Sequence, residues 1–588
     1  MQNYEKKTKI VCTIGPSSDS TEMLEKLMKA GMNVCRLNFS HGSHEEHKVR
    51  IDRIKEVRER LNLPVAIMLD TKGPEIRLRD FENGEIDLKY GDRFTLTTRE
   101  IIGNKNEVSV SYKDLAKDVK AGDRILVDDG LCELRVIEVI NGEDIVCEAR
   151  NYATLKNKKG VNVPDANINL PALTERDIED IKFGIDNEID FIAASFIRKP
   201  EDVFEIRKIL EASTCPNIGI ISKIESQEGV DNIKEIVRAS DGIMVARGDL
   251  GVEIETEIMP LVQKEIIRLV NSLQKPVITA TQMLDSMIRN PRPTRAEVTD
   301  VANAILDGSD AIMLSGETAA GKYPLEAVET MTRIAIKTEN SEEFLEAMAK
   351  KIQTKNASTS DSIAKASVNI SNSVNASSIL TATSTGETSR LISKYRPNRP
   401  IIAATYSKEV TRALSLVWGV YPVLTDVSEH TDEVIENSII ASLDEKLIKE
   451  GDLIVITAGI PVGVKGTTNL IKVHTVGDII GGGTGIGFGS VTGRVLKIEK
   501  IEDLNRFEKG MIIASRYTDK DFVEKIKEAK AVLTIEGGLT SHAAIVSLNY
   551  KVPCIVGIEN LLEDVVDGEI VTVDAEKGIL YRGEARVL

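Results

Sequence analysis

Eight short apolar runs, rich in β-branched residues, recur through the first 320 residues, and a helix-like amphipathic segment follows each of them. The runs are KIVCTIG, NVCRLNF, VAIMLD, DFIAASF, GIISKIE, GIMVARGD, PVITATQ and AIMLSGE. Near-continuous apolar strands that alternate with helices are typical of a parallel sheet covered on both faces. Eight such units predict a closed (β/α)8 TIM barrel, with a doubly wound open sheet as the alternative.

The spacing of these runs has one large gap, of about 120 residues, between VAIMLD and DFIAASF. Within it, residues 71–170 show Gly-Asp turns and alternating patterns such as GDRFTLTT and AGDRILVDDG, which are typical of short antiparallel strands. We therefore expect residues 1–70 and 171–340 to form the barrel. Residues 71–170 should form an inserted all-β domain that acts as a lid over the barrel mouth.

An α/β pattern resumes after residue 340, with the runs SSILTATST, PIIAATY, GVYPVLTD and GDLIVITAG separated by helix-like segments. It predicts an open-sheet α/β domain over residues 341–474. The glycine-dense stretch GDIIGGGTGIGFGSVTG then has little side chain to pack, and predicts a flexible boundary or a set of tight turns. A last α/β domain over residues 475–588 should follow.

Composition narrows the possible partners. A chain of 588 residues is too long for one core and predicts three or more domains. The formal net charge of -17, without a long basic stretch, argues against nucleic acid and anionic membranes as partners.

The six cysteines form no CxxC pair and predict reduced core thiols. No stretch resembles a signal peptide or a membrane span, so we expect a cytoplasmic protein.

In a barrel of this kind the reacting groups follow the carboxyl ends of the strands. Charged and hydroxyl side chains follow six of the eight runs. They are Arg36, Asn38, Ser40 and His41 after the second run; Asp70, Thr71, Lys72, Glu75 and Arg77 after the third; Lys223 and Glu225 after the fifth; Arg247 and Asp249 after the sixth; Thr281 after the seventh; and Ser315 and Glu317 after the eighth. Any one of these residues could form only a salt bridge, but their convergence favours an active site.

The residue types indicate the chemistry. Lys223 and Glu225 stand two apart on one strand, so their side chains share a face. Glu225 and Asp249 supply two hard oxygen ligands, which suit Mg²⁺ that keeps water and substrate oxygens in its other positions. Arg36, Arg77 and Lys223 bring positive charge for a phosphate, and ARGD opens a helix whose free N–H groups can hold an anion. This combination favours phosphoryl transfer with an enolate intermediate.

Seven longer motifs together resemble the pyruvate kinase family: KIVCTIGPSS, MNVCRLNFSHG, LDTKGPEIR, IISKIESQEGV, DGIMVARGDLGVE, ATQMLDSMIRNPRPTRAE and AIMLSGETAAGKYPLEAV. The resemblance covers about residues 1–474. It implies a barrel with a lid inserted after the third strand and a C-terminal effector-binding domain. It also implies transfer of the phosphoryl group of phosphoenolpyruvate to ADP, which gives pyruvate and ATP in the final step of glycolysis, in a homotetramer.

The resemblance also implies roles for single residues. Lys223 matches the lysine that stabilises the transferring phosphoryl group, and Arg36 matches an arginine that contacts phosphate. Glu225 and Asp249 match the ligands of Mg²⁺ (or Mn²⁺). The resemblance also places Ala246, Gly248 and Asp249 around the substrate carboxylate, and Arg77 and Thr281 near the substrate. It implies proton delivery by Thr281, Ser315 and Glu317, and contacts with the nucleotide by Asn38, His41 and Arg77.

A monovalent cation is implied as well. Asn38, Ser40, Asp70 and Thr71 match the oxygen ligands of that cation. Family members with glutamate at the position of Glu75 need K⁺, whereas a lysine there replaces the cation, since either one places positive charge beside the phosphate. We therefore expect activation by K⁺.

The segment HGSHEEH spaces His41, His44 and His47 three residues apart, which raises the alternative of a zinc site. We expect instead a helix that starts only at the second of these histidines, with His41 near the nucleotide.

The segment TSTGETSR, residues 383–390, follows a strand-like run and leads into a helix, in the outline of a hydroxyl-rich phosphate site. A simple capped turn is the alternative. The resemblance implies a small phosphorylated allosteric effector here, whether a sugar bisphosphate, a sugar monophosphate or AMP. The implied contacts are Thr383, Ser384, Thr385, Gly386 and Thr388, with Gly463, Lys465 and Gly466 from the loop GIPVGVKGTTN.

Near the chain end, GGLTSHAAIV resembles the phosphohistidine domain of phosphoenolpyruvate-utilising enzymes, with His542 aligned on the phosphoryl carrier. Those carriers serve an ATP-grasp domain, for which no region remains here, and Ser547 stands where they usually have an arginine. We expect a vestigial His542 in a docking or regulatory domain. One alternative is an enzyme that uses this histidine. Another is a non-catalytic scaffold, in which Lys223, Glu225 or Asp249 would be expected to be replaced, although all three are present.

Overall fold

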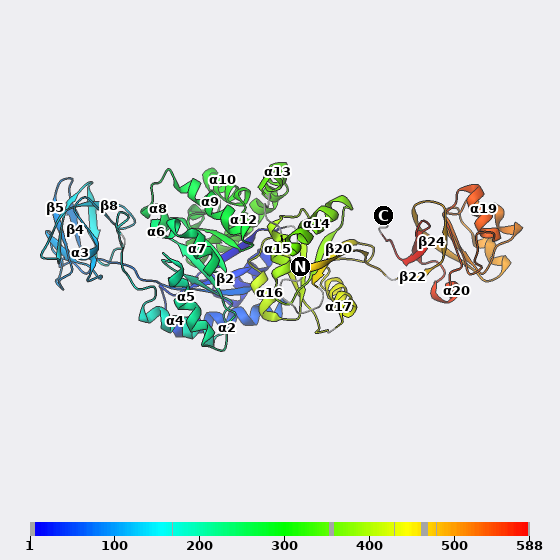
Figure 1. Ribbon diagram of the computed structural model, residues 1–588, viewed down its shortest axis with the longest axis horizontal. Coiled ribbons are helices and arrows are strands. Elements are labelled where there is room, and N and C mark those ends of the chain that lie inside the picture. The colour runs from blue at the N-terminus through cyan, green and yellow to red at the C-terminus, as the bar shows by residue number, and fades with distance from the viewer. Residues whose placement is uncertain are drawn as a thin grey trace. The chain divides into compact units, whose positions relative to one another are not determined.

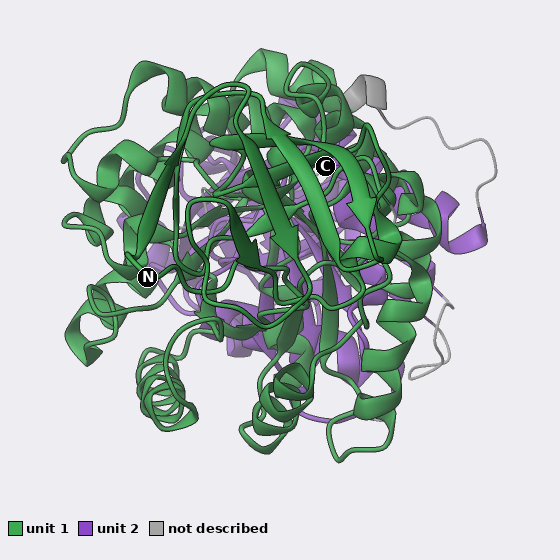
Figure 2. Cartoon of the chain, turned by 90° about the vertical axis from the view of Figure 1, so that its left-hand side faces the viewer, with its two compact units in different colours: residues 1–354, 408–420 green, residues 355–407, 421–588 purple. Residues whose placement is uncertain are grey.

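The computed structural model describes residues 6–166, 168–351, 358–428, 430–459, 468–477 and 479–585 (Figure 1). The chain divides into two compact units, residues 1–354 with 408–420 and residues 355–407 with 421–588 (Figure 2). Each unit is described by itself.

The first unit contains a closed barrel of eight parallel strands in the order β1-β16-β15-β14-β13-β12-β3-β2. The strands are β1 (Lys9–Thr13), β2 (Val34–Asn38), β3 (Ala66–Asp70), β12 (Phe191–Ala194), β13 (Gly219–Ile224), β14 (Gly242–Ala246), β15 (Val277–Ala280) and β16 (Ala311–Leu314). They coincide with the eight apolar runs, because helices cover the outside of the barrel and side chains such as Met68, Met244 and Ile278 fill the inside. The predicted barrel is confirmed, and the open sheet is excluded.

Helices follow each barrel strand. Those of seven residues or more are α1 (Thr21–Ala30), α2 (His44–Arg60), α4 (Glu175–Asp186), α5 (Pro200–Glu211), α7 (Ile233–Ala239), α8 (Arg247–Glu253), α9 (Met259–Ser272), α10 (Arg295–Asp307) and α12 (Pro324–Glu339). The shorter ones are α6 (Gln227–Asp231), η1 (Asp285–Ile288) and α11 (Gly316–Ala319). Capping boxes begin α2 at Ser43, α4 at Thr174 and α10 at Thr294, and α2 starts at His44 as predicted.

The insertion after β3 folds around a core of its own. Its six-stranded sheet has the order β11-β7-β8-β9-β5-β6, and β10 pairs with β4. The strands are β4 (Glu85–Leu88), β5 (Arg93–Thr97), β6 (Glu107–Ser109), β7 (Arg124–Val127), β8 (Cys132–Ile140), β9 (Asp144–Ala149), β10 (Ala153–Lys156) and β11 (Val161–Asn162). One helical turn, α3 (Leu115–Asp118), interrupts what is otherwise the predicted β domain.

The second unit begins with a five-stranded sheet, β19-β18-β17-β20-β21. Its strands are β17 (Ser378–Ala382), β18 (Ile401–Thr405), β19 (Val420–Leu424), β20 (Leu453–Gly459) and β21 (Thr468–Thr475). The helices α14 (Thr359–Ser373), α15 (Glu387–Lys394) and α17 (Thr431–Asp444) belong to this domain. β17 runs parallel to β18 and β20, and β21 is antiparallel at the edge, so the predicted open α/β sheet is confirmed.

The last domain has an eight-stranded sheet in the order β22-β29-β28-β24-β25-β26-β27-β23. The strands are β22 (Ile479–Gly482), β23 (Thr484–Ile486), β24 (Ser490–Ile498), β25 (Ile512–Ser515), β26 (Ala531–Thr534), β27 (Cys554–Val556), β28 (Ile570–Asp574) and β29 (Ile579–Arg582). β24 to β27 are parallel neighbours, and α18 (Val523–Ile526), α19 (His542–Tyr550) and α20 (Leu561–Asp564) connect strands.

The glycine-dense stretch before this domain is not the flexible boundary that we predicted. It forms β22 and β23, the two edge strands of the eight-stranded sheet. A Cβ on Gly483 would lie 2.5 Å from the carbonyl oxygen of Val556, and one on Gly485 would lie 2.0 Å from that of Ala575. The glycines are therefore explained by close approach of the backbone rather than by mobility.

All six cysteines are free thiols; five are buried in cores, as predicted, whereas Cys215 is partly exposed. Within the described ranges, no helix has the length and apolar character that crossing a bilayer requires.

Candidate active site

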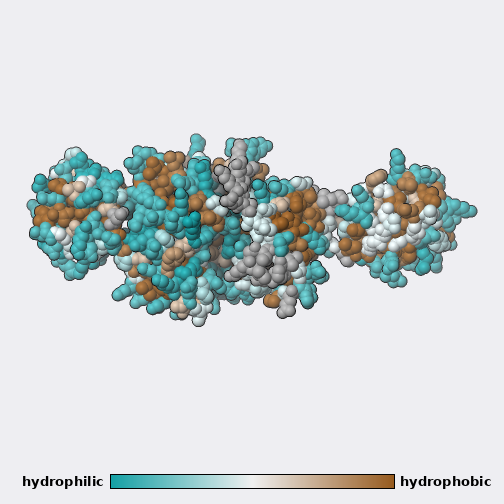
Figure 3. All heavy atoms as spheres, in the orientation of Figure 1, coloured by the Kyte–Doolittle hydropathy of each residue, from teal (hydrophilic) through white to brown (hydrophobic). Residues whose placement is uncertain are grey.

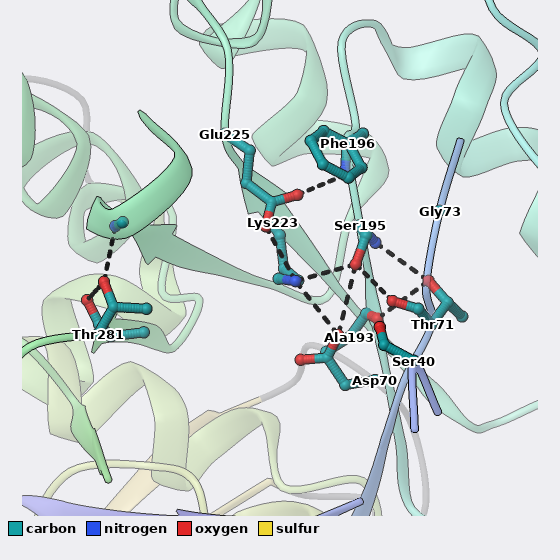
Figure 4. Close-up of polar contacts among 12 residues, drawn as sticks. Ser40, Asp70, Thr71, Gly73, Ala193, Ser195, Phe196, Lys223, Glu225 and Thr281 are labelled. Atoms are coloured by element: carbon teal, nitrogen blue, oxygen red, sulfur yellow. Dashed lines mark hydrogen bonds and ion pairs between the residues drawn. The ribbon is translucent and has the colours of Figure 1, made fainter. Parts of the chain in front are cut away.

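A buried ion-paired cluster lies at the carboxyl ends of β2, β3 and β13 (Figure 4). The Lys223 Nζ lies 3.2 Å from Asp70 Oδ1, 2.9 Å from Glu225 Oε1 and 2.9 Å from Ser195 Oγ. Arg36 donates from Nε to the other oxygen of Asp70 at 2.6 Å. The Lys223 and Arg36 side chains are 11% exposed and both carboxylates 1%, so these charges interact with little screening by water.

Neighbouring charges decide the protonation of this cluster. Burial alone would lower the pKa of the Lys223 ammonium, but Asp70 and Glu225 outweigh burial and raise that pKa above its ordinary value. Burial would raise the pKa of Asp70, but Arg36 and Lys223 outweigh it and lower that pKa. Lys223 therefore stays a cation at neutral pH, as the stabilisation of a phosphoryl group requires.

Glu225, which is buried, and Asp249, which is partly buried, form a pair of carboxyl groups. Burial raises the pKa of Glu225 to about 7, with Lys223 opposing this shift and Asp249 adding to it. Burial also raises the pKa of Asp249, which is hydrogen-bonded to Glu225. The backbone N–H of Phe196 donates to Glu225 Oε2 at 2.6 Å and fixes its orientation.

The donor atoms of this pair fit a hard divalent cation. Among the described residues, no group of three or more His, Cys, Asp and Glu side chains is placed to hold a metal ion. Two carboxylates without a further protein ligand suit Mg²⁺ (or Mn²⁺), which keeps several waters and substrate oxygens in its coordination shell.

Oxygen atoms gather at the ends of β2 and β3. Asn38 lies opposite Asp70 in the strand register, and its Oδ1 accepts the N–H of Ser40 at 3.1 Å. Thr71 Oγ1 accepts the N–H of Ser195 at 3.1 Å, and the Ser195 hydroxyl donates to the Thr71 carbonyl at 2.6 Å. Figure 4 shows Ser40, Asp70 and Thr71 together on the side of the site where Ser195 lies. An all-oxygen set with one carboxylate fits a monovalent cation.

Thr281 lies directly after β15, next to the start of α8. The Gly248 N–H donates to Thr281 Oγ1 at 2.8 Å, and Ala246 precedes α8 as its N-cap. The structure thus brings Thr281 together with the amides near Asp249.

Glu317 has a different environment from that of Glu225. Its carboxylate accepts the N–H of Ser315 at 2.7 Å and the N–H of Leu284 at 3.1 Å, and the residue is 2% exposed. Burial raises the pKa of this carboxyl group. Glu317 thus ties the loop after β15 to the loop after β16.

Two of the predicted residues lie apart from the buried cluster. Arg77 Nη2 pairs with Glu75 at 2.7 Å, and Nη1 donates to the Lys158 carbonyl at 2.7 Å. His41 is exposed on the loop after β2, where its carbonyl oxygen lies 2.8 Å from Nε2 of His47. A pocket of about 190 Å³ between the insertion and the barrel is lined by Glu75, together with Asp129, Asn162, Phe196, Arg198, Asp249 and Glu253.

Sequence reasoning missed Ser195 and Phe196, which follow the fourth barrel strand. Both contact charged groups of the cluster, Ser195 through its hydroxyl and Phe196 through its amide. The position of Ser195 directly after the run DFIAA was the available signal, since strand ends carry the reacting groups.

The predicted effector loop lies in the second unit, between β17 and α15. Thr383 Oγ1 accepts the N–H of Gly386 at 2.9 Å, and the hydroxyls of Thr388 and Thr468 lie 2.8 Å apart. Hydroxyl groups dominate the lining of a pocket at this loop, with Thr383, Ser384, Thr385, Thr388, Thr405, Tyr406, Thr425, Ser428 and Thr431. Gly463, Lys465 and Gly466 lie outside the described residues.

His542 is the first residue of α19, with Ser541 as its N-cap. Its Nδ1 lies 2.9 Å from Thr518 Oγ1, a residue that the sequence did not single out. The helix buries Ala543, Ala544 and Ser547 and exposes larger apolar residues, Ile545 at 52% and Leu548 at 67%. Figure 3 shows apolar atoms gathered on the surface of this domain.

Comparisons with known proteins agree with this geometry. The family model for the pyruvate kinase barrel domain matches residues 5–328, that for the pyruvate kinase alpha/beta domain matches 361–474, and that for the mobile domain of PEP-utilising enzymes matches 507–578. The chain is 51% identical over 588 residues to a pyruvate kinase of Bacillus licheniformis, covering 99% of this chain and 100% of that protein. It is 50% identical over 586 residues to one of Staphylococcus haemolyticus, with the same coverage.

Among solved structures, a pyruvate kinase from Cryptosporidium parvum matches with a TM-score of 0.76 and 42% sequence identity, over 80% of this chain and 96% of that one. The barrel, the α/β domain and the full-length relatives lead to the same assignment. The chain therefore belongs to the pyruvate kinase family of phosphotransferases.

Proposed function

We propose that this chain transfers the phosphoryl group of phosphoenolpyruvate to ADP, gives pyruvate and ATP, and catalyses the final step of glycolysis in the cytoplasm. The observation that carries the proposal is the buried cluster at the barrel mouth, where Lys223 stays protonated between Asp70 and Glu225. A fixed cation in a site with little water stabilises the charge that develops on a transferring phosphoryl group.

Different residues around Lys223 bind different parts of the substrates. Lys223 and Arg36 bind the phosphoryl oxygens, and Lys223 also faces the enolate oxygen that forms when the P–O bond breaks. The backbone around Ala246, Gly248 and Asp249 holds the substrate carboxylate, since a helix N-terminus favours an anion. The Gly248 N–H first has to share or leave its bond to Thr281 Oγ1. Thr281 lies on the path of the proton that converts the enolate into pyruvate, with Ser315 and Glu317 beyond it. Asn38, His41 and Arg77 contact the nucleotide, and Arg77 first has to leave Glu75.

Metal ions complete the charge balance. Glu225 and Asp249 would hold Mg²⁺ (or Mn²⁺), which supplies positive charge to the phosphoryl and enolate oxygens. Asn38, Ser40, Asp70 and Thr71 would hold K⁺. The need for K⁺ follows from Glu75, because this position carries a negative charge where a lysine would supply a positive one.

A coupled assay of pyruvate formation from phosphoenolpyruvate and ADP tests the proposal. Lys223→Met removes the central cation and should lower kcat by roughly 100-fold or more, as the loss of a preorganised charge does. Lys182→Met, at an exposed lysine on α4, is the matched control and should leave kcat unchanged. A parent protein that forms no pyruvate contradicts the proposal.

The hydroxyl-lined pocket at residues 383–388 supports a phosphorylated effector. Its described lining holds two carboxylates, Glu387 and Asp426, and many hydroxyls, so phosphate would be held by hydroxyl and amide groups. We propose allosteric activation through this pocket in a homotetramer. A panel of sugar bisphosphates, sugar monophosphates and AMP in the same assay identifies the ligand, and Thr383→Val should weaken the response.

The last domain supports a docking or regulatory role, with His542 as a vestigial carrier. Its exposed apolar side chains, Ile545 and Leu548, favour contact with another protein surface. Phosphoryl transfer by His542 is the second candidate function, for which the contact between Thr518 and His542 Nδ1 would orient the ring. We also propose the domain boundaries at residues 70/71, 170/171 and 340/341. The last boundary, expected at 474/475, falls after Val476, because Val476 is buried in the core of the preceding domain.

A further inference from the structure

Thr281 has a backbone conformation that a β-branched residue rarely adopts. Its φ is +68°, and φ of the next residue, Gln282, is +54°, so two successive residues occupy the left-handed region. Such a conformation is strained in a residue other than glycine and persists only where surrounding contacts hold it. Neither residue is a glycine, so contacts elsewhere must hold this turn.

The side chain of Arg247 supplies these contacts. Its Nε donates to the carbonyl of Ala280 at 3.2 Å, and its Nη2 donates to the carbonyl of Thr281 at 2.7 Å. The guanidinium also makes a two-pronged bond to Asp300, from Nη1 to Oδ1 at 2.8 Å and from Nη2 to Oδ2 at 2.7 Å. Because the Arg247 side chain is only 13% exposed, it connects α8, the end of β15 and α10 in a largely dry environment.

The turn sets the direction of the Thr281 hydroxyl. Oγ1 donates to the carbonyl of Ala280 at 2.6 Å and accepts the N–H of Gly248 at 2.8 Å. Arg247 thus holds Thr281 from its backbone side while the adjacent residue of α8 binds its hydroxyl. A Thr281 that relaxed to negative φ would move the hydroxyl away from this amide.

We propose that Arg247 is a positioning residue, whose guanidinium keeps Thr281 in the left-handed conformation and so keeps its hydroxyl in place for the proton step. This inference rests on the function proposed above. In that step an O–H bond of the proton donor, a hydroxyl or a water, breaks. Its proton forms a C–H bond with the methylene carbon of the enolate, whose C=C electrons supply the bond, and the enolate oxygen becomes the ketone oxygen of pyruvate.

The two steps of the reaction should respond differently to a change at Arg247. Figure 4 shows Thr281 on the opposite side of the site from Ser195, Asp70 and Thr71. Loss of the guanidinium should therefore slow proton delivery more than it weakens the binding of the phosphoryl group. If Arg247 acted only through its positive charge, its loss would affect proton delivery and the binding of the phosphoryl group to a similar extent.

Arg247→Lys separates geometry from charge, since a lysine keeps the positive charge but lacks the planar fork. The proton step is measured by the exchange of the methyl protons of pyruvate in D₂O, with Mg²⁺, K⁺ and ATP present. We expect Arg247→Lys to slow this exchange roughly 10-fold or more, as misplacement of a catalytic group does. The KM for phosphoenolpyruvate should change by less than about 3-fold, since uniform binding is retained.

Gln282→Gly provides the test of strain, because glycine adopts positive φ without penalty. Gln282 is exposed, and the single change should leave exchange within about 2-fold of the parent, since a φ-compatible glycine costs little. In the Arg247→Lys background the same change should recover a large part of the lost exchange rate. Asp300→Asn removes the carboxylate that binds the Arg247 guanidinium but keeps Arg247 itself. It should slow exchange less than Arg247→Lys does, again with little change in the KM for phosphoenolpyruvate.

The inference is overturned if Arg247→Lys raises the KM for phosphoenolpyruvate as much as it slows exchange, or if Gln282→Gly gives no recovery. Thermal melts show whether each variant folds. If Arg247→Lys does not fold, the effect of Asp300→Asn on exchange and on KM tests the inference instead. A parent protein without pyruvate formation contradicts the proposed function itself, and the inference with it.

Discussion

The hydroxyl of Ser195 lies 2.9 Å from the Lys223 ammonium nitrogen and donates to the Thr71 carbonyl at 2.6 Å. One buried hydroxyl thus joins the lysine proposed for the phosphoryl site to the oxygen atoms proposed for the monovalent cation. Because the bond to Lys223 involves a charged group, its loss should cost more than that of an ordinary surface hydrogen bond.

Ser195→Ala should therefore lower kcat by roughly 10-fold, which corresponds to the loss of one hydrogen bond to a charged group. It should also raise the K⁺ concentration needed for half-maximal activity, since the Thr71 carbonyl loses the Ser195 hydroxyl that donates to it. Ser272→Ala, whose exposed hydroxyl bonds only within its own helix, is the control. Equal K⁺ dependence in Ser195→Ala and parent would show that Ser195 does not organise the cation site.

The affinity for Mg²⁺ should depend on pH. Burial raises the pKa of Glu225 to about 7, so below pH 7 this carboxyl is protonated and must lose its proton before it can bind a metal ion. Affinity should thus fall as pH decreases, and be roughly 10-fold weaker at pH 6 than at pH 8 if one proton is released.

Calorimetric titration of the substrate-free protein with Mg²⁺ at the two pH values measures this effect. Glu225→Gln removes the titrating group and should bind weakly at both. An affinity for Mg²⁺ that is the same at pH 6 and pH 8 would show that Glu225 is already ionised at pH 6.

Activity should require K⁺. Omitting K⁺ should lower the rate of the parent by roughly 10-fold or more, because a charge a few ångströms from the phosphate is missing. Glu75→Lys places a positive charge at this position and should make the rate independent of K⁺. Glu82→Lys, an exposed change in the insertion, should retain the dependence. Equal rates of the parent with and without K⁺ would contradict the prediction.

Removal of the last domain should leave catalysis largely intact, provided that Val476 is kept. Val476 is fully buried in the core of the preceding domain and exchanges backbone hydrogen bonds with Gly451 and Asp452. A protein ending at Gly477 should keep the kcat of the parent and change in stability, assembly or effector response. One ending at His474 should melt at a lower temperature, since it loses this buried side chain. Loss of kcat in the longer truncation would show that the last domain takes part in catalysis.

His542 should carry no phosphoryl group after incubation with phosphoenolpyruvate. The site lacks the arginine usual in carriers, and Ser547 at that position is buried in α19. Acid-labile phosphate on the protein measures the modification, with Lys223→Met used to exclude turnover in the barrel. Phosphate that disappears in His542→Ala would show a working carrier.

The barrel could be predicted because strands buried on both faces leave continuous apolar runs that no surface segment imitates. The charged residues proposed for the site were selected by the same logic, as they follow these runs. Ser195 was missed because a hydroxyl next to an apolar run has no distinctive charge or spacing. Thr518 was missed because it stands 24 residues before His542, and only the folded sheet brings the two together.

The direction in which a side chain points is harder to predict from the sequence than the position of the residue on a strand or loop. Arg77 and His41 stand near the strand ends in sequence, yet Arg77 pairs with Glu75 and His41 is exposed. The glycines near residue 483 were misread for a related reason, since composition does not distinguish a mobile glycine from one that must fit beneath a carbonyl. For the glycines the deciding contact comes from a distant part of the chain, whereas Arg77 pairs with a carboxylate only two residues away.

The pairing of β22 with β29 determines how the last domain joins the rest of the chain. Ile479 lies opposite Tyr581, so the chain enters and leaves this sheet at the same edge, although about a hundred residues separate the two positions. A unit whose two ends emerge side by side can be gained or lost as a cassette without pulling apart the sheet to which it is attached. This geometry offers a simple evolutionary route by which a complete glycolytic kinase could acquire a carrier-type domain.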